Sequence, residues 1–537
     1  MNKLIKTIYV LAAIIIFSAP SCTKLDETIY DKVLTSDFYK TQDEIIAALV
    51  PAYGDLRTLI DLRGTHSLGE FSTDEVILPT RGRHWYDGGN FQRFSEHTWT
   101  SEVAYLNNGW NAQFQLVNRS NMLIYQFSKL DNMDATLKES FTAELKCLRA
   151  LGYFYLLDNF GNVPIVDRFD VPAGYLPANN VDFTTGRKEV FNFVESDLIS
   201  NVDKVSADNN SSTYGRMNKW AAYALLTKLY INAQVWTGTA KWDEAITYAD
   251  KIIGSGNFIL EPNYFANFVS QNQNSKENIF AVPYDEYRTG NGWGSYNTTI
   301  WYLVGQHFTG NKIFGVPASG TSGSCALPSH YRSYDPKDIR LKGWMIGQQY
   351  NKATGQQILC TEESAPLPLE YTIDFINRVN PNDGIVYDHK NALEYMGARF
   401  SKYEINYQGN GMPNDYAMFR LADILLLKAE ALMRKNNGVA TQTAVDLVNQ
   451  VRQRAFAPAD YVPLTTGTLT LDQLLKERSW ELYFEGWRRQ DLVRWGKFVR
   501  GTWEFFDRSG ESDTRNVYPI PQPQMNSNTN LKQNPGY

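Results

Sequence analysis

The chain has 537 residues, of which 43% are hydrophobic and 14% aromatic, so it can bury a core in one large domain or in about two to three ordinary ones. Its formal net charge is -6 and no run rich in Lys and Arg appears, so nucleic acid is not expected as a partner.

The beginning of the chain has the anatomy of a signal peptide. Two lysines precede the apolar block Ile8–Phe17, which is too short to span a bilayer and ends in small residues at 18–21. Cys22 follows directly with a thiol that can carry a diacylglyceryl group, so the segment resembles a bacterial lipoprotein box. We predict a signal peptide over 1–21, acylation of Cys22, and a lipid tether over 22–35 that anchors the protein without spanning the membrane.

The alternative is plain secretion, with Cys22 as a bystander. If Cys22 is acylated, the remaining three of the four cysteines are an odd number. A disulfide framework is therefore not expected to hold the exported protein together.

Helices are predicted wherever large apolar residues recur at i, i+3, i+4 and i+7. These segments are Ser36–Leu59, Tyr105–Leu130, Lys138–Asn159, Arg187–Val205, Asn218–Val235, Trp242–Ile253, Tyr416–Lys435, Gln442–Ala455 and Leu471–Val499. By contrast, Gly54–Ser101 and Asn257–Arg399 are rich in Gly, Asn, Thr and aromatic residues and show little periodicity. They are predicted to be long loops with short strands.

Two pairs of these helices share one pattern. Trp220–Trp236 runs through a short turn into Lys241–Ile253, and Phe419–Lys435 is followed by Thr443–Ala455. In each pair a long helix with Ala at close-packing positions precedes an amphipathic one, which resembles the tetratricopeptide hairpin. The pairs are not contiguous in sequence, so the predicted fold is a mainly α-helical superhelix of degenerate hairpins with a loop-rich subdomain containing minor strands.

The last predicted helix combines aromatic and charged residues. Within it, Glu485 could pair with Arg489, and Arg488 with Asp491, across one helical turn. Charge on a helix face is usually solvated or structural, so Glu481 and Glu485 are interpreted as structural and not catalytic. The aromatic residues at helical spacing are Trp480, Phe484, Trp487, Trp495 and Phe498.

Six segments in order resemble the SusD-like (SusD/RagB) family of outer-membrane lipoproteins. They are Ala143–Val166, Tyr214–Trp236, Asn274–Asp285, Phe419–Leu432, Trp480–Phe498 and Tyr518–Tyr537. The resemblance implies a non-catalytic, cell-surface glycan-binding lipoprotein built on about four tetratricopeptide-like helix pairs, with no cofactor. It also implies that the protein captures oligosaccharides at the outer membrane, facing the cell exterior, as a lid on a SusC-like TonB-dependent transporter.

On this basis the mature chain divides into two SusD-like parts. The N-terminal helical part covers 36–256 and carries a binding loop at 71–100. The C-terminal part covers 257–537, with a loop region at 257–399 and helices at 416–499.

Glycan recognition needs flat aromatic faces and planar polar groups on loops. Phe71–Thr100 is one such loop, and the family resemblance implies a hydrogen-bonding role for Asp74 and a stacking role for Trp99. The alternative to a binding role, for each of these aromatic residues, is packing in the core.

Tyr287–Gln306 is the second such loop. The resemblance places a stacking Tyr near Tyr296, with Trp293 or Tyr302 as substitutes. Where the starch-binding founder of the family carries a further stacking Trp, this chain has Gly323, which argues against starch as the ligand.

No motif of a hydrolase elbow, zinc protease, Walker loop or dinucleotide site is found, and the six His lack metal-ligand spacing. We therefore expect neither an enzyme nor a metal site. Asp74 and Glu75 are adjacent carboxylates, yet sequence spacing does not place them on opposite sides of a glycosidic bond. Two alternatives remain: a tetratricopeptide-type lid or scaffold for peptide or other nutrient uptake, and an unrecognised glycosidase.

Overall fold

The computed structural model describes residues 41–131, 133–287, 305–361, 367–409 and 411–537. The chain divides into two compact units, 1–47 and 48–537. In the described part of the first unit, the Thr41 amide donates to Glu44 Oε2 at 2.9 Å and the Glu44 amide donates to Thr41 Oγ1 at 3.3 Å. This reciprocal pair is a capping box at the start of helix α2, Gln42–Leu59.

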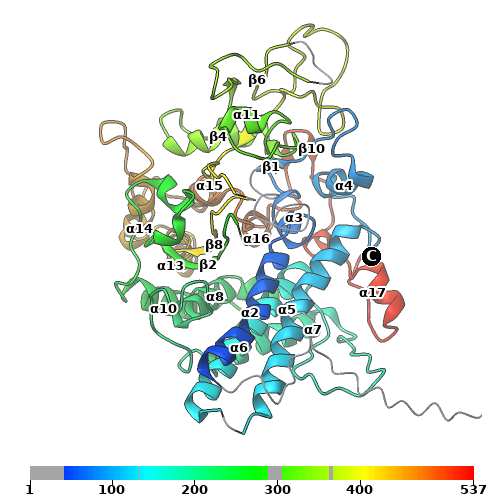
Figure 1. Cartoon of the computed structure of the whole chain (residues 1–537), viewed down its shortest axis with the longest axis vertical. Helices are drawn as coiled ribbons and strands as arrows, with labels where there is room; N and C mark the ends of the chain where they lie inside the picture. The colour runs from blue at the N-terminus through cyan, green and yellow to red at the C-terminus, as the bar shows by residue number, and fades with distance from the viewer. Residues whose placement is uncertain (1–40, 132, 288–304, 362–366, 410) are drawn as a thin grey trace, which may run out of the picture. The chain divides into compact units, whose positions relative to one another are not determined.

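A succession of packed helices runs through the second unit, and the predicted helix-dominated fold class is confirmed (Figure 1). Each helix packs against the next along the series α5, α6, α7, α8, α10, α13 and α14. Their bounds are Ala104–Ser128, Ala135–Asn159, Phe183–Ile199, Lys219–Ile231, Trp242–Ile253, Leu421–Lys435 and Gln442–Gln453. Side-chain N-caps fix several of their starts, as at Asp134, Asp182, Asn218 and Thr441.

Small residues set how closely these helices approach. A Cβ on Gly152 of α6 would lie 2.8 Å from Val117 Cγ2 of α5, so Gly is required at this crossing. Ala245 and Ala249 of α10 are fully buried. The two predicted hairpins, α8–α10 and α13–α14, both form, and they contact each other through α10 and α13 although more than 160 residues separate these helices in sequence, from Ile253 to Leu421.

The predicted helix Tyr416–Lys435 is wrong at its beginning. Tyr416–Arg420 is strand β8, which pairs antiparallel with β2, Asn278–Val282, and α13 begins only at Leu421. All five residues of β8 are buried, so burial on both faces replaces the alternation that usually marks a strand. A short apolar run of this kind cannot be distinguished from a helix by periodicity.

The predicted helix Leu471–Val499 is wrong in its middle, because the chain breaks there into α15, Leu471–Leu482, and α16, Arg488–Arg494. Phe484 and Gly486 between them adopt φ values of +60° and +83°. The predicted pairs across one turn therefore do not form: Glu485 binds Lys402 and Arg420, Arg489 binds Asp158, and Arg488 binds Asp74. Ion pairs with residues distant in sequence therefore replace the pairs expected within one helix.

The regions predicted as loops contain short helices, which among the described residues are α3, Thr65–Glu70; α4, Asn90–Glu96; α11, Gly310–Phe314; and α12, Pro328–Ser333. Outside these regions lie the short helices α9, Ala233–Thr237, and α17, Gln522–Ser527. A four-stranded sheet has the order β1 (Val76–Ile77), β3 (Cys325–Ala326), β7 (Arg399–Phe400) and β4 (Trp344–Met345). Two-stranded pairs join β5 (Gly347–Gln348) to β6 (Glu370–Tyr371) and β9 (Thr502–Trp503) to β10 (Phe506–Asp507). The predicted combination of long loops and short strands is thus confirmed, with short helices added.

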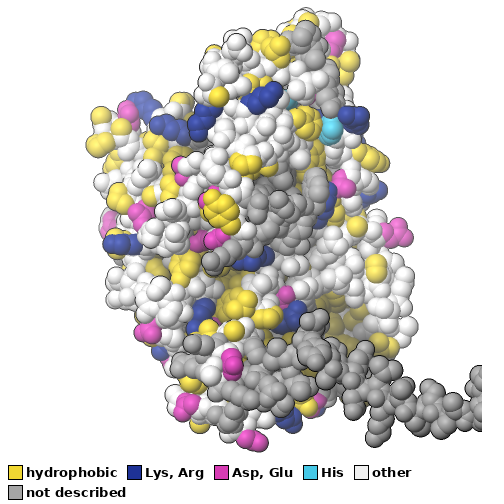
Figure 2. Space-filling model, in the orientation of Figure 1, with side chains coloured by type: hydrophobic (Ala, Val, Ile, Leu, Met, Phe, Trp, Pro, Cys, Tyr) yellow, Lys and Arg dark blue, Asp and Glu magenta, His cyan; other side chains and the backbone are white. Residues whose placement is uncertain are grey.

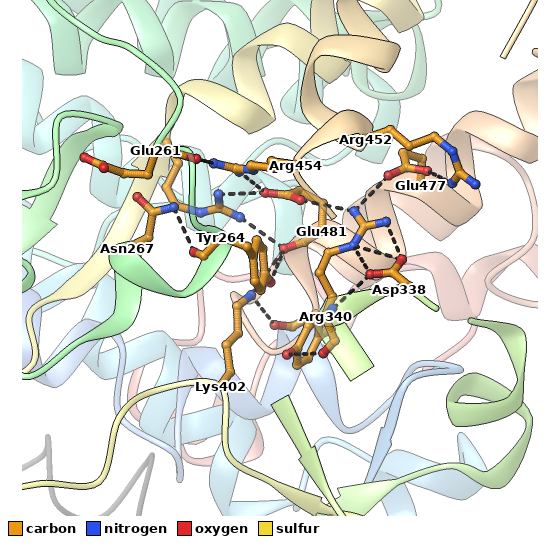
Figure 3. Close-up of polar contacts among 12 residues, drawn as sticks. Glu261, Tyr264, Asn267, Asp338, Arg340, Lys402, Arg452, Arg454, Glu477 and Glu481 are labelled. Carbon is orange, nitrogen blue, oxygen red and sulfur yellow. Dashed lines mark hydrogen bonds and ion pairs between the residues drawn. The ribbon is translucent and has the colours of Figure 1, made fainter. Parts of the chain in front are cut away.

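A buried network of charges joins the loop-rich region to the helices (Figure 3). Glu481 accepts from Arg340 at 3.2 Å and from Arg454 at 2.6 Å, and Glu477 accepts from Arg340 at 2.8 Å. Arg420 adds contacts to Glu481 at 3.0 Å and to carboxylates on two other segments. The carboxylates of Glu477 and Glu481 are completely buried, which confirms that Glu481 is structural.

No helix in the described parts of the chain combines the length and the apolar character needed to cross a bilayer. On the face drawn in Figure 2, Lys and Arg side chains lie in several separate places with acidic side chains among them.

Candidate functional site

The structure brings three of the sequence's loop segments together. The amide of Ser322 donates to the carbonyl of Gln306 at 2.6 Å, and the indole Nε1 of Trp85 donates to the carbonyl of Thr321 at 2.6 Å. The rings of His84 and Phe308 lie 4.5 Å apart. Residues 81–89, 305–308 and 319–323 therefore form one continuous region, called here the Tyr86 surface.

Tyr86 is the exposed aromatic residue of this surface. Its exposed fraction is 55%, whereas its neighbour Trp85 is 9% exposed. Trp85 packs edge-on against Phe91 at 5.8 Å, and Phe91 packs against Tyr105 at 5.2 Å. An aromatic ring presented beside a rigidly packed neighbour is the kind of flat apolar face on which a sugar stacks.

The backbone around Tyr86 is held in an uncommon conformation. Trp85 and Asp87 both have positive φ values, +62° and +44°, and Gly88 and Gly89 follow at +64° and +75°. A non-glycine residue in this region costs about 1–3 kcal/mol and persists only where its surroundings impose it. Such strain clusters at ligand-binding sites, so this segment is a candidate binding element.

Polar contacts of Asp87, the residue that follows Tyr86, hold the backbone in this conformation. Asp87 Oδ2 accepts a hydrogen bond from the Tyr105 hydroxyl and lies 3.5 Å from Arg63 Nε, which itself donates to the Tyr105 hydroxyl at 3.0 Å. The Asp87 carbonyl accepts from Asn90 Nδ2 at 2.7 Å. Tyr86 therefore lies between two anchored residues, Trp85 and Asp87, and its ring can meet a ligand with little loss of conformational entropy.

Trp99 does not lie on this surface, because its side chain is completely buried. Its ring packs against Tyr518 at 4.8 Å and is parallel to that of Phe498 at 6.3 Å. Its Nε1 donates to the Tyr537 hydroxyl at 2.7 Å. The predicted stacking role of Trp99 is therefore wrong. Its side chain packs in the core and contacts the C-terminal segment at Tyr518 and Tyr537, so no face of its ring is open to a sugar.

Asp74 borders a different cavity, of about 230 Å³, whose lining includes Trp480 and Trp503. Both of its carboxylate oxygens accept from Arg488, at 2.6 and 2.7 Å. Burial raises the pKa of Asp74, but the Arg488 guanidinium outweighs this effect, so the pKa lies below its ordinary value. None of the residues lining this cavity belongs to the Tyr86 surface, and the structure does not bring Asp74 and Trp99 into one aromatic site.

Glu75 is buried beside the same cavity. It is 1% exposed, its Oε1 accepts from the Ser479 hydroxyl at 2.6 Å, and the same oxygen lies 3.4 Å from Arg488 Nε. Burial is the largest influence on Glu75 and raises its pKa to about 8. Asp74 and Glu75 are thus adjacent carboxyl groups that both contact Arg488, which is not the pair flanking a glycosidic bond that hydrolysis requires.

The other predicted site residues fall outside the described part of the chain. They are Cys22, Trp293, Tyr296 and Tyr302. The last two residues of the second predicted loop, Gly305 and Gln306, belong to the Tyr86 surface together with His307 and Phe308, which follow it. Gly323 lies at the edge of this surface, where its carbonyl accepts from the buried Arg399 at 3.1 Å.

Sequence reasoning singled out the loop at 71–100 but did not name Tyr86 within it. The signal was present in the tripeptide Trp85–Tyr86–Asp87 followed by two glycines, which is typical of a tight turn that exposes a ring. Among the residues that the structure describes, no group of three or more His, Cys, Asp and Glu is arranged to hold a metal ion.

The chain thus combines stacked helices with a loop-rich region of short strands, and one loop of that region exposes the Tyr86 ring. Residues 257–537 match the model of the SusD family, and residues 63–231 match a model described as starch-binding and associating with the outer membrane. The first model alone covers more than half of the chain. The chain belongs to the SusD family, as its sequence motifs predicted.

Relatives match along most of their length. The starch-binding protein SusD of Bacteroides thetaiotaomicron is 26% identical over 524 residues, covering 88% of this chain and 85% of that protein. A SusD-like protein of Bacteroides ovatus is 23% identical over 505 residues, covering 92% and 83%.

Solved structures show the same fold. A laminarin-binding SusD-like protein is 24% identical with a TM-score of 0.71, covering 93% of this chain and 100% of that one. Surface glycan-binding protein A of Bacteroides thetaiotaomicron, solved with laminarihexaose, is 19% identical with a TM-score of 0.70, covering 92% and 99%.

Proposed function

We propose that this protein is a non-catalytic, cell-surface glycan-binding lipoprotein that captures oligosaccharides and passes them to a TonB-dependent outer-membrane transporter. The exposed Tyr86 ring on an anchored loop of a SusD-family scaffold is the observation that carries the proposal. Relatives described as starch-binding, laminarin-binding and glycan-binding support the ligand class.

The chemistry of the Tyr86 surface suits a sugar. Tyr86 offers an apolar face to the C–H side of a pyranose, and the neighbouring Arg83 is exposed and carries donors for hydroxyl groups. Trp293, Tyr296 and Tyr302 lie in the segment that leads directly into Gly305, so we include them as further stacking candidates. Several aromatic rings contributed by neighbouring loops would let a weak site hold an extended chain of sugars.

Replacing Tyr86 by Ala is expected to weaken oligosaccharide binding by about 1–2 kcal/mol, or about 5–30-fold in Kd, because the sugar loses its stacking surface. Isothermal titration calorimetry with maltohexaose and laminarihexaose measures the change. Tyr175→Ala is the matched control, since Tyr175 is similarly exposed, at 48%, but lies outside the Tyr86 surface.

Equal losses in the Tyr86 and Tyr175 variants, or no loss in either, would remove Tyr86 from the site. Release of reducing sugar by the pure protein would contradict the non-catalytic role and favour a glycosidase. Binding of a peptide pool in place of every glycan tested would favour the peptide-uptake alternative.

The proposal for location rests on the signal-like segment 1–21 and on Cys22 directly after it. A lipid at Cys22 with a tether over 22–35 holds the protein at the outer membrane, and the family-model description of outer-membrane association agrees with this placement. Confinement there raises the effective concentration against a transporter. We place the transporter contact on the hairpins α8–α10 and α13–α14, because a rigid stacked surface loses little entropy on binding.

Tagged wild-type protein extracted in mild detergent is expected to co-purify with a TonB-dependent barrel near one to one. Cys22→Ala should move the protein from the outer-membrane fraction to a soluble one and reduce recovery of the barrel, because tethering no longer concentrates the two partners. Membrane fractionation, acyl labelling and mass spectrometry of the eluate measure these outcomes. A Cys22→Ala protein that still pellets and carries the same acyl label would contradict lipidation at this residue.

A further inference from the structure

A second cleft lies on the helical part of the molecule, away from the residues of the Tyr86 surface. Its volume is about 460 Å³, within the range of about 300–1,000 Å³ that small-molecule sites occupy. One wall comes from the loop that precedes α8, at 209–214, and the other from residues 273–278 at the start of β2. No residue is shared between this cleft and the Tyr86 surface, which covers 81–89, 305–308 and 319–323.

Side-chain amides and hydroxyls line this cleft, which is called here the amide cleft. They include Asn209, Asn257, Gln273, Asn274 and Ser211, all of them exposed. An amide carries two donors and an acceptor with two lone pairs, which matches the mixed donor and acceptor character of a sugar hydroxyl.

The charge of the lining restricts the ligand further. Lys276 is the charged residue in this lining, and no carboxylate belongs to it. A cation therefore finds no counter-ion among these residues, and a polyanion meets a single Lys. Tyr214 is partly exposed and supplies aromatic surface between the amides, whereas Phe258 is only 5% exposed.

A buried amide without partners borders this cleft. Asn278 is 8% exposed, and neither its Oδ1 nor its Nδ2 has a hydrogen-bond partner among the described residues. A buried amide without partners is unfavourable, so native structures rarely keep one unless a ligand or water satisfies it. Both atoms have almost no solvent-accessible surface, so a hydroxyl group in the cleft can pair with them only after the Asn278 side chain or its neighbours move.

Both walls of the amide cleft are held in place without a ligand. On one side, Thr213 Oγ1 donates to the Asp208 carbonyl at 2.9 Å. On the other, Asn272 Nδ2 donates to the carbonyls of Asn267 and Asp415 at 2.9 and 2.8 Å, and Asn272 Oδ1 accepts from the Asp415 amide at 2.7 Å. Such preorganised walls lower the entropy cost of binding.

We propose that the amide cleft is a second binding site for a neutral oligosaccharide, distinct from the Tyr86 surface. The ligand class rests on the proposed function, whereas the location rests on the amide lining and on Asn278. Two separate sites on one chain would let the protein hold two parts of a long glycan, so that avidity exceeds the affinity of either site.

Hydrogen–deuterium exchange with maltohexaose and with laminarihexaose tests this site on the whole mature protein. We expect protection of 208–214 and 271–278 in addition to 81–89, and we expect the first two to stay protected in Tyr86→Ala. Gln273→Ala/Asn274→Ala, which changes exposed residues only, should weaken binding at the amide cleft roughly tenfold through the lost hydrogen bonds. Gln234→Ala, an exposed amide of α9 outside the cleft, is the control and should leave binding unchanged.

A second variant separates binding from folding. Asn278→Leu removes the unpaired amide, so it should abolish protection of the cleft without lowering the unfolding midpoint; a lowered midpoint with unchanged protection would overturn the inference. Protection at 81–89 alone would overturn the second site and leave the proposed function intact. Protection at neither place would contradict both, and protection at the amide cleft alone would support the second site while moving the proposed function away from Tyr86.

Discussion

Replacing Arg420 by Met is expected to lower the free energy of unfolding by about 3–5 kcal/mol, because it leaves buried carboxylates without their shared cation. The guanidinium donates to Glu277 at 2.7 Å, to Glu481 at 3.0 Å, and to Glu485 at 2.8 and 2.9 Å. All four residues are at most 2% exposed. Urea unfolding followed by tryptophan fluorescence measures the loss.

Two further variants show whether geometry or charge is responsible. Arg420→Lys keeps the charge but cannot donate in several directions from one planar group, so we expect an intermediate loss. Arg332→Met breaks an ion pair with Asp374 in which both side chains are nearly half exposed, and it should cost less than about 1 kcal/mol. An Arg420→Met protein within about 1 kcal/mol of wild type would contradict the structural role of the network.

The same network predicts a dependence on pH. Burial raises the pKa of Glu481, but Arg454, Arg420 and Arg340 outweigh burial and hold the pKa well below its ordinary value. A depressed pKa in the folded state means that the contribution to stability is present above the unfolded pKa of about 4.3 and is lost as the pH falls below it. The difference between wild type and Arg420→Met should therefore shrink in acid.

Replacing Trp99 by Ala is expected to lower the free energy of unfolding by about 3–5 kcal/mol, because it opens a cavity among packed aromatic rings. It also removes the hydrogen bond to Tyr537 and the ring against which Tyr518 packs. The C-terminal segment should become more accessible, which limited proteolysis measures together with urea unfolding.

Trp99→Phe separates packing from binding. It keeps most of the buried apolar surface and loses the indole N–H, so we expect a smaller destabilisation and unchanged oligosaccharide affinity below the unfolding transition. Loss of sugar binding in a fully folded Trp99→Phe protein would contradict the packing role and restore the stacking role that the family resemblance implied.

The sequence predicted those elements whose pattern lies within one short stretch of the chain, and it missed features that depend on distant residues. Trp242–Ile253 forms over the predicted residues because its amphipathic pattern and its core contacts agree. Tyr416–Arg420 was misread because a strand buried on both faces carries no alternation. The break after Leu482 was missed because the partners of Glu485 lie more than 60 residues away, at Lys402 and Arg420.

The candidate site shows the same division. The sequence placed aromatic loops at 71–100 and 287–306, and the structure joins the first of them to the residues that end the second, through the contact of His84 with Phe308. The sequence did not show which aromatic residue of the first loop is exposed. Trp99 and Tyr86 are both aromatic loop residues, and their burial differs because one meets the C-terminal segment while the other projects between two anchored neighbours.

By itself the sequence determined the helix-dominated class, the two hairpins and membership of the SusD family, because periodicity, small-residue spacing and ordered motifs are written along the chain. Tertiary structure alone decided the contact of α10 with α13, the charge network around Arg420, and the choice of Tyr86 over Trp99 as the exposed ring. Each of these depends on residues that are far apart in sequence and come into contact only in the folded core. Burial and ion pairing arise from those tertiary contacts, so the sequence does not show them directly.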